Sequence, residues 1–208
     1  MSLLVLKMSV VEYPPITTVT IGLKTKNSVI LASEKIYAYD NYIISKNVKK
    51  IYPITNYLGI AFAGVMGDIE ILTNYYKARL ALYELETRHQ ISVKAAAKLL
   101  SKIFYGHRYI PFLTQSILGG VDETGPQLYS LDLLGSLITD DVLSVGLGSD
   151  FALGVLESSY SADLDTDGAV NLAVSAIKAA IKRTAGSGKG IDLLVITSRG
   201  LQEKYIEL

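Results

Sequence analysis

The order of strand-like and helix-like segments is the feature that most constrains how this chain can fold. Apolar residues recur with a helical period over 67–89, 92–103 and 165–183, and a shorter helix is expected over 148–158. Runs with strand character precede, separate and follow these helices, over 18–24, 28–36, 48–54, 57–64, 113–121, 127–134, 142–145, 191–197 and 203–206. The order is therefore strands, two helices, strands, two helices, strands, and no linker, repeat or low-complexity segment divides it.

This order predicts a four-layer αββα sandwich of the α+β class, in which two antiparallel sheets stack face to face and helices cover each outer face. Strands between such layers are buried on both faces, so they should read as nearly continuous apolar runs. The stretches 57–64 and 142–147 have this character. A mean hydropathy of +0.32, with 50% hydrophobic residues, agrees with an unusually large interior.

The composition excludes several kinds of functional site. The chain has no cysteine, which excludes disulfides, thiolate metal sites and a cysteine nucleophile. Its two histidines, His89 and His107, are interpreted as cap or surface residues rather than as metal ligands or catalytic bases. Twenty Lys and Arg residues balance twenty Asp and Glu residues, and this zero net charge argues against nucleic-acid binding. We expect no metal site.

Two glycine-rich stretches resemble nucleotide-binding loops but lack the residues that define them. The pattern that begins at Gly146 needs a third glycine where the chain has Phe151. The pattern around Gly188 needs a leading glycine where the chain has Arg183. Both are interpreted as plain turns, and no cofactor is expected. The uncharged stretch 51–67 is interrupted by proline and glycine, which indicates strand, turn and strand rather than a membrane-spanning helix.

Three polar residues in the first half of the chain stand at equal intervals. Thr18 heads the first strand, and Glu34 and Lys50 follow at spacings of 16 residues. In two consecutive hairpins, residues with this spacing can converge near one end of a sheet. The two charged residues lie on otherwise apolar strands, where an unpaired buried charge is costly, so we expect them to pair. A surface ion pair explains the same spacing equally well.

Seven short blocks, modest one by one but specific in their order and spacing, carry a resemblance to a known family. They are Thr18-Val-Thr-Ile-Gly-Leu, Val29-Ile-Leu-Ala-Ser-Glu-Lys, Lys46-Asn-Val-Lys-Lys-Ile, Ile60-Ala-Phe-Ala-Gly-Val-Met-Gly-Asp, Gly119-Gly-Val-Asp, Gly154-Val-Leu-Glu-Ser-Ser-Tyr and Ile191-Asp-Leu-Leu-Val-Ile-Thr. With them the chain resembles a β-type subunit of the archaeal 20S proteasome, which is an N-terminal-nucleophile hydrolase. The resemblance extends from residue 18 to about residue 199.

The resemblance implies a fold and a division of the chain. The fold is the αββα sandwich of N-terminal-nucleophile hydrolases, with two stacked antiparallel sheets flanked by helices. In active members the chain is cut so that a threonine becomes the new N-terminus. Carried over to this sequence, residues 1–17 are a propeptide-like extension and residues 18–208 are the proteasome β-type domain.

The resemblance also implies a catalytic role for five positions. Thr18 takes the nucleophile position, and its own α-amino group, with an ordinary pKa of about 7.7–8.0, serves as the base. Lys50 polarises the hydroxyl, and Glu34 holds that lysine. The backbone N–H of Gly64 is the oxyanion donor, and Ser187 helps to hold the amino group.

Five mostly large and apolar residues surround the substrate side chain by the same resemblance: Tyr37, Val48, Tyr52, Phe62 and Met66. Their character predicts a preference for hydrophobic side chains if the subunit turns over substrate. Ordinary core packing is the alternative interpretation, and for Phe62 it is the favoured one.

Three positions depart from the pattern of active members. These members have a serine and an aspartate where this chain has Leu147 and Thr184, and a glycine before the cut where it has Thr17. A buried amine that loses a hydrogen-bonding partner costs about 1–3 kcal/mol. A β-branched residue before the cut obstructs the close-packed backbone that self-cleavage needs. Because all three departures affect the same step, we expect a structural β subunit with a vestigial threonine site.

Two alternatives stay open. The first is an active threonine endopeptidase that processes itself to expose Thr18, because this residue, Glu34 and Lys50 are all present. The second is a stand-alone amidohydrolase of the same superfamily.

The resemblance implies partners and a location. The partners are proteasome α subunits, a second and catalytic β subunit and, through the complex, unfolded polypeptides; neither a membrane nor nucleic acid is among them. The location is the cytoplasm.

The stretch 109–177 contains ten acids and no Lys or Arg, and we expect these acids to meet basic residues of a neighbouring subunit. The lysines at 35, 46 and 49 are expected to cluster around the Lys50 site.

Overall fold

The fold is known from a computed structural model, which describes residues 19–39, 42–184 and 188–208. Within these ranges the chain forms two five-stranded sheets, a separate two-stranded sheet and four helices. The helices and strands follow one another in the predicted order.

The first sheet contains strands from both ends of the described chain. Its order is β10-β1-β2-β11-β12, and all neighbours are antiparallel. The strands are β1 (Val19–Lys24), β2 (Ser28–Glu34), β10 (Val142–Gly146), β11 (Gly190–Thr197) and β12 (Gly200–Glu207). β2 is buried at every residue, as expected for a central strand that is covered on both faces.

The second sheet is formed by the middle of the chain. Its order is β5-β6-β7-β8-β9, again with antiparallel neighbours. The strands are β5 (Ile51–Pro53), β6 (Leu58–Gly64), β7 (Thr114–Asp122), β8 (Gly125–Leu131) and β9 (Leu137–Thr139). β6 is also buried along its whole length, which accounts for its continuous apolar sequence.

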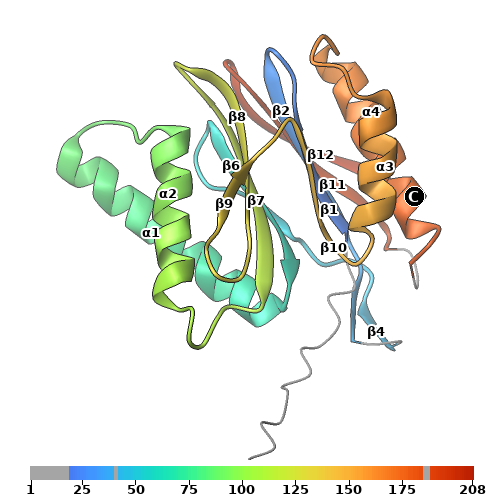
Figure 1. Cartoon of the computed structure of the whole chain (residues 1–208), viewed down its shortest axis with the longest axis horizontal. Coiled ribbons are helices and arrows are strands. Elements are labelled where there is room, and N and C mark those ends of the chain that lie inside the picture. Colours follow the sequence, from blue (N-terminus) through green and yellow to red (C-terminus); the bar gives the residue numbers. More distant parts are fainter. Residues whose placement is uncertain (1–18, 40–41, 185–187) are drawn as a thin grey trace, which may run out of the picture.

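Two helices cover the outer face of each sheet, and the inner faces meet in the middle (Figure 1). α1 (Met66–Thr87) and α2 (Val93–Gly106) cover the second sheet, whereas α3 (Ser149–Ser159) and α4 (Thr166–Ile181) cover the first. Two helices begin at the polar caps that the sequence supplies. The Ser92 hydroxyl accepts from the N–H of Ala95 at 3.3 Å, and the Asp165 carboxylate accepts from the N–H of Gly168 at 2.7 Å.

Three apolar clusters fill the spaces between these four layers. One lies under α1 and α2, one lies under α3 and α4, and the third lies between the sheets. The third contains inward residues of both sheets, among them Val29, Leu31, Ala61, Ile117 and Leu194. The predicted αββα sandwich of the α+β class is therefore confirmed. None of the helices within the described ranges has the length and apolar character that crossing a membrane requires.

Short strands are the part of the fold that differs from the sequence prediction. A hairpin of β3 (Tyr37–Tyr39) and β4 (Tyr42–Ser45) forms a sheet of its own, and neither this hairpin nor β9 was predicted. The strand predicted over 48–54 is limited to the three residues of β5. Runs of three or four residues have too little alternation to be recognised as strands.

Several acids of 109–177 have partners within the chain, and their expected contact with basic residues of a neighbouring subunit stays a prediction. Asp141 lies 2.9 Å from the ammonium of Lys24, and Asp163 lies 2.5 Å from that of Lys26. Other carboxylates of this stretch accept backbone N–H groups at turns and helix starts: Asp122, Asp132 and Asp165. These five of the ten acids thus have a role in the fold of this chain.

Candidate functional site

Glu34 and Lys50 form a buried ion pair at one end of the sandwich. Glu34 is the last residue of β2, and Lys50 directly precedes β5 of the other sheet. Nζ of Lys50 lies 2.6 Å from Oε1 of Glu34, and the two side chains are 0% and 2% exposed. The two residues therefore pair as their spacing predicted. Their burial excludes the alternative of a surface ion pair.

Both members of the pair also hold the backbone of Ile36. The Lys50 ammonium donates a hydrogen bond to the Ile36 carbonyl oxygen at 2.7 Å, and the N–H of Ile36 donates to Oε2 of Glu34. These three residues thus form a closed ring of interactions. Among the described residues the ammonium has these two acceptors, which leaves its third hydrogen for another group. No residue pattern pointed to Ile36 in advance, because its contribution comes from the backbone.

Burial acts against both charges of the pair. It raises the pKa of the Glu34 carboxyl and lowers the pKa of the Lys50 ammonium, because each charged form loses its hydration. The opposite charge and the hydrogen bonds counteract these shifts without cancelling them. A lysine whose pKa is lowered in this way is common at functional sites.

The sequence neighbours of two further predicted site residues lie beside this pair. Thr18 and Ser187 themselves fall outside the described residues. Val19 begins β1, and its backbone N–H is among the groups that stabilise the ionised carboxylate of the pair. Gly188 packs so tightly that a Cβ added to it would lie 2.9 Å from the nitrogen of Ile36. The residues that directly follow Thr18 and Ser187 in sequence therefore both lie beside the ion pair, as the predicted site requires.

Gly64, the predicted oxyanion donor, ends β6 at a point where no side chain fits. A Cβ at this position would lie 2.3 Å from the carbonyl oxygen of Leu113 and 2.5 Å from Cα of Thr114. Two residues earlier on the same strand, the N–H of Phe62 donates to the carbonyl oxygen of Lys50 at 2.9 Å. Packing therefore requires glycine here, and β6 is joined directly to the residue that carries the ammonium.

Two buried hydroxyls connect the sheets next to the ion pair. The hydroxyls of Thr20 and Ser33 lie 2.8 Å apart, and the Thr20 hydroxyl donates to the carbonyl oxygen of Phe62 at 2.8 Å. Thr20 is on β1 of the first sheet, and Phe62 is on β6 of the second. These hydroxyls were not predicted, although small polar residues within otherwise apolar strands were a visible signal.

The two lysines next to the pair in sequence have acidic partners on the last two strands. Lys35 nevertheless lies near Lys50, as expected: burial is the main cause that lowers the pKa of the Lys50 ammonium, and the charge of Lys35 adds to that lowering. Lys35 pairs with Asp192 of β11 at 2.6 Å. Lys49 pairs with Glu203 of β12 at 2.5 Å. Because each of these charges has its own acid, only the Lys50 ammonium enters the ring described above.

Comparison with known proteins shows where this architecture belongs. The family described as "Proteasome subunit" matches residues 17–196, which is most of the chain. The chain belongs to the proteasome subunit family. The αββα sandwich described above is accordingly the fold of N-terminal-nucleophile hydrolases.

Three similar proteins specify the kind of proteasome subunit. "Proteasome subunit beta 2" of Caldivirga maquilingensis is 45% identical over 192 residues, which is 92% of this chain and 96% of that protein. "Proteasome subunit beta 1" of Staphylothermus marinus is 45% identical over 180 residues, or 86% and 84%. "Proteasome subunit beta 1" of Desulfurococcus amylolyticus is 45% identical over 186 residues, or 89% and 92%. This chain is a β-type subunit of the 20S proteasome, and its family implies assembly with α subunits in a core particle.

Two of the three positions at which this β subunit departs from the active pattern, Leu147 and Thr184, lie within the described residues, and Thr17 lies outside them. Leu147 follows β10, and its side chain is 56% exposed. The hydroxyl of Thr184 donates to the carbonyl oxygen of Ala180 one helical turn earlier, at 3.2 Å. A Cβ on Gly148 would lie 3.3 Å from Cγ2 of Thr184, so the methyl group of the threonine approaches this turn.

The five predicted substrate-pocket residues divide into two groups in this β subunit. Phe62 is fully buried in the apolar cluster under α1 and α2, and Tyr52 and Met66 pack against the same cluster. The rings of Tyr52 and Phe62 meet edge to face with centroids 6.1 Å apart. Phe62 therefore serves the core, whereas Tyr52 and Met66 are only partly buried and their contact with substrate stays a prediction. Tyr37 and Val48 are half-buried and lie outside that cluster, and their contact with substrate stays a prediction.

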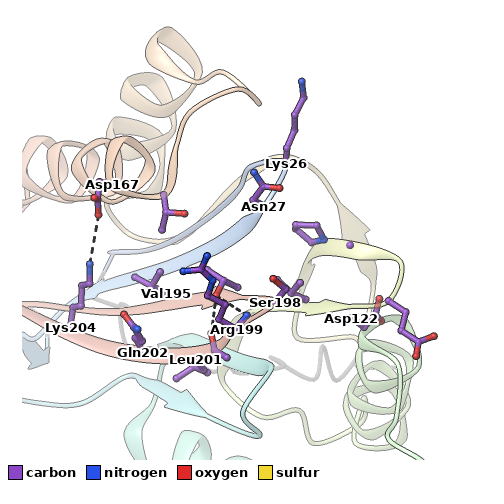
Figure 2. A pocket seen from close by; sticks show the side chains of 17 residues that line it. Lys26, Asn27, Asp122, Asp167, Val195, Ser198, Arg199, Leu201, Gln202 and Lys204 are labelled. Carbon is purple, nitrogen blue, oxygen red and sulfur yellow. Dashed lines mark hydrogen bonds and ion pairs between the residues drawn. The ribbon is translucent and has the colours of Figure 1, made fainter.

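A large pocket of this β subunit lies away from the ion pair, at the other end of β1 (Figure 2). It has a volume of about 810 Å³ and is formed by the turns that follow β1, β7 and β11. Charged residues of both signs line it, among them Lys26, Asp122, Arg199 and Lys204. Because its lining includes neither Glu34 nor Lys50, it is not part of the predicted site. Within the described ranges, no group of His, Asp and Glu residues could hold a metal ion.

Proposed function

We propose that this chain is a structural β subunit of the 20S core particle, which degrades unfolded proteins to peptides, and that its own threonine site has little or no activity. The proposal is carried by the side chains at positions 147 and 184. The side chain of Leu147 has no hydrogen-bonding group, and the hydroxyl of Thr184 donates to the Ala180 carbonyl oxygen in the last turn of α4. A catalytic amine at Thr18 would therefore lack two of the groups that hold it in active members.

The loss matters because the proposed base is the nucleophile's own amine. A base must lie within hydrogen-bond reach of the proton it accepts, in a fixed orientation. Without polar neighbours the amine is both misplaced and poorly stabilised when it takes up a proton, which costs about 1–3 kcal/mol for each missing partner. The Ser187 hydroxyl is the remaining predicted holder, and one contact does not fix an amine in three dimensions.

The proposal includes the division of the chain. Residues 1–17 are a propeptide-like extension that stays attached, and residues 18–208 are the β-type domain. Thr17 supports retention of the extension, because a branched side chain before the scissile bond hinders the tight turn that self-cleavage needs. A retained extension keeps the amine of Thr18 within a peptide bond, where it cannot act as a base.

The proposed role determines the partners. A β subunit without activity needs a second, catalytic β subunit in the same particle, together with the α subunits, and it meets unfolded polypeptide only through the complex. We place this particle in the cytoplasm. No cofactor is part of the proposal, because the residues predicted for the site supply the nucleophile, base and charge themselves.

An active threonine endopeptidase is the second candidate, and the intact ion pair favours it. The third hydrogen of the Lys50 ammonium is available to the Thr18 hydroxyl, and Glu34 holds the ammonium in place. In this case Thr18 attacks the scissile carbonyl and the Gly64 N–H stabilises the oxyanion. Tyr37 and Val48 then contact the substrate side chain. The stand-alone amidohydrolase has no comparable observation in its favour.

The intact mass of the chain in an assembled particle separates the two candidates. The full chain is co-expressed with α subunits and a catalytic β subunit, and the purified particle is analysed by mass spectrometry. We expect the mass of all 208 residues. Loss of residues 1–17 with a free amine on Thr18 would overturn the proposal, as would labelling of Thr18 by a hydroxyl-directed covalent inhibitor.

Two variants show which subunit makes any cut that is observed. Thr18→Ala removes the proposed nucleophile, so a cut that persists in this variant is made by another subunit. Lys50→Met removes the ammonium but leaves the threonine. A cut that is lost in both variants is self-cleavage, and it identifies an active site in this chain.

A further inference from the structure

Lys35 lies between Glu34 and Ile36, which contribute a carboxylate and a backbone peptide to the closed ring of interactions. Three contacts with other parts of the chain hold Lys35 in place. Its ammonium pairs with Asp192 at 2.6 Å, and the two side chains are only 11% and 19% exposed. Its carbonyl oxygen accepts from the N–H of Val48 at 2.9 Å. Gly188 packs against its backbone, where an added Cβ would lie 3.0 Å from the nitrogen of Lys35.

The Lys35–Asp192 ion pair lies where the pairing of β2 with β11 ends, directly beside the ring formed by Glu34, Ile36 and Lys50. Pairing between β2 and β11 ends where Glu34 faces Ile191. Lys35 is thus the first residue beyond the ladder, and Asp192 faces Ser33 on the preceding rung. Because ladder hydrogen bonds stop at Glu34, the ion pair is the side-chain link that ties the next residues to β11.

We propose that Lys35 and Asp192 are positioning residues for the Glu34–Lys50 pair. Their ion pair fixes the turn formed by residues 34–36. This turn presents the Ile36 N–H to the Glu34 carboxylate and the Ile36 carbonyl oxygen to the Lys50 ammonium. Hydrogen bonds weaken steeply with distance and misalignment, so a small movement of the Ile36 peptide weakens both contacts at once.

The neighbouring Lys49–Glu203 pair provides a matched control. It also joins a lysine next to the ring with an acid of a late strand, at 2.5 Å. Its side chains are, however, 45% and 50% exposed, and such pairs contribute little. Both ion pairs border the same pocket of about 300 Å³. The two pairs thus share an environment, but only Lys35 lies within the turn that builds the ring.

Amide hydrogen exchange of Ile36, resolved to the single residue in the full chain, tests the proposal. In Asp192→Asn and in Lys35→Met we expect the Ile36 amide to exchange roughly tenfold faster, because local opening of the turn becomes easier. Amides in the middle of β6 should keep their rates. The conservative variants Asp192→Glu and Lys35→Arg should restore most of the protection, and Glu203→Gln should leave Ile36 unchanged.

Two results would overturn this assignment. One is an unchanged amide exchange rate of Ile36 in both Asp192→Asn and Lys35→Met, which would show that the turn of residues 34–36 is stable without the ion pair. The other is an equal acceleration of Ile36 and of the β6 amides, which would show a loss of global stability instead of local positioning. The inference concerns the geometry of the ion pair and does not rest on activity, so its failure and that of the proposed function are separate results.

Discussion

The hydroxyl of Thr20 donates a hydrogen bond to the carbonyl oxygen of Phe62 across 2.8 Å, and this bond joins the two sheets of the sandwich. Thr20 is the second residue of β1, directly after the start of the described chain. Phe62 is held in turn by its N–H, which donates to the carbonyl oxygen of Lys50. The bond therefore connects the strand that follows Thr18 to the residue that carries the buried ammonium.

Replacing Thr20 by valine should remove this bond while keeping the shape of the side chain. The Phe62 carbonyl and the Ser33 hydroxyl then lose a partner in a buried place, so we expect the free energy of unfolding to fall by about 1–3 kcal/mol. Urea unfolding followed by circular dichroism measures the change. Thr20→Ser keeps the hydroxyl and should lose clearly less. A Thr20→Val variant at least as stable as Thr20→Ser would show that the hydroxyl contributes no more than the methyl group.

Replacing Lys50 by methionine should leave the Glu34 carboxylate buried without its counter-ion. Removal of one partner of a buried pair typically costs about 3–5 kcal/mol. The double variant Glu34→Met/Lys50→Met removes both charges and should recover most of that loss. Denaturant unfolding of the three proteins at neutral pH checks this. A single variant as stable as the parent chain would show that the pair contributes nothing to folding.

The Lys50→Met variant should also depend more strongly on pH than the parent chain. Burial already raises the pKa of Glu34 above its ordinary value of 4.5, and Lys50 is the group that opposes the rise. Without it the folded state binds a proton at pH values where the unfolded chain does not. Stability then falls as pH rises from about 4.5 through the folded pKa. Unfolding at pH 5, 6 and 7 should show the highest stability at pH 5, and a flat profile would contradict this.

Gly64→Ala should destabilise the fold although it adds one methyl group. The new Cβ would meet backbone atoms of Leu113 and Thr114 at 2.3 and 2.5 Å, and backbone cannot move aside as a flexible side chain can. We expect the free energy of unfolding to fall by about 1–3 kcal/mol, as measured by urea unfolding. Gly154→Ala is the matched control. It lies on an exposed part of α3 with nothing within 4 Å, and there alanine should stabilise by up to about 1 kcal/mol.

Replacing Thr17, Leu147 and Thr184 by the residues of active members should restore self-cleavage, because we propose that these three departures make the threonine site inactive. The triple variant Thr17→Gly/Leu147→Ser/Thr184→Asp, assembled with its partner subunits, should lose residues 1–17, as seen by intact mass. Adding Lys50→Met to the triple variant should abolish the cut. An uncut triple variant in a correctly assembled particle would show that further positions keep the site inactive.

The elements that the sequence determined are the long ones. Helix α1 is long enough for its apolar period to be recognised, and strand β6 is recognised by its continuous apolar run. Ser92 and Asp165 marked where helices begin. The alternation of strand groups and helix pairs then left the four-layer sandwich as the natural packing. By contrast, the β3–β4 hairpin and β9 are too short to carry a period, and they exist because neighbouring strands or turns support them.

The ion pair is the part of the candidate site that the sequence determined. Two charges at a fixed spacing on apolar strands were expected to pair, since an unpaired buried charge is costly. That the pair is buried and not on the surface was decided by the tertiary structure. The pairs Lys35–Asp192 and Thr20–Phe62 join residues that are distant in sequence and belong to different elements. Only the register of β2 on β11 and the stacking of β1 on β6 bring them together. Local residue patterns carry no information about that register, because it is decided by the packing of whole sheets.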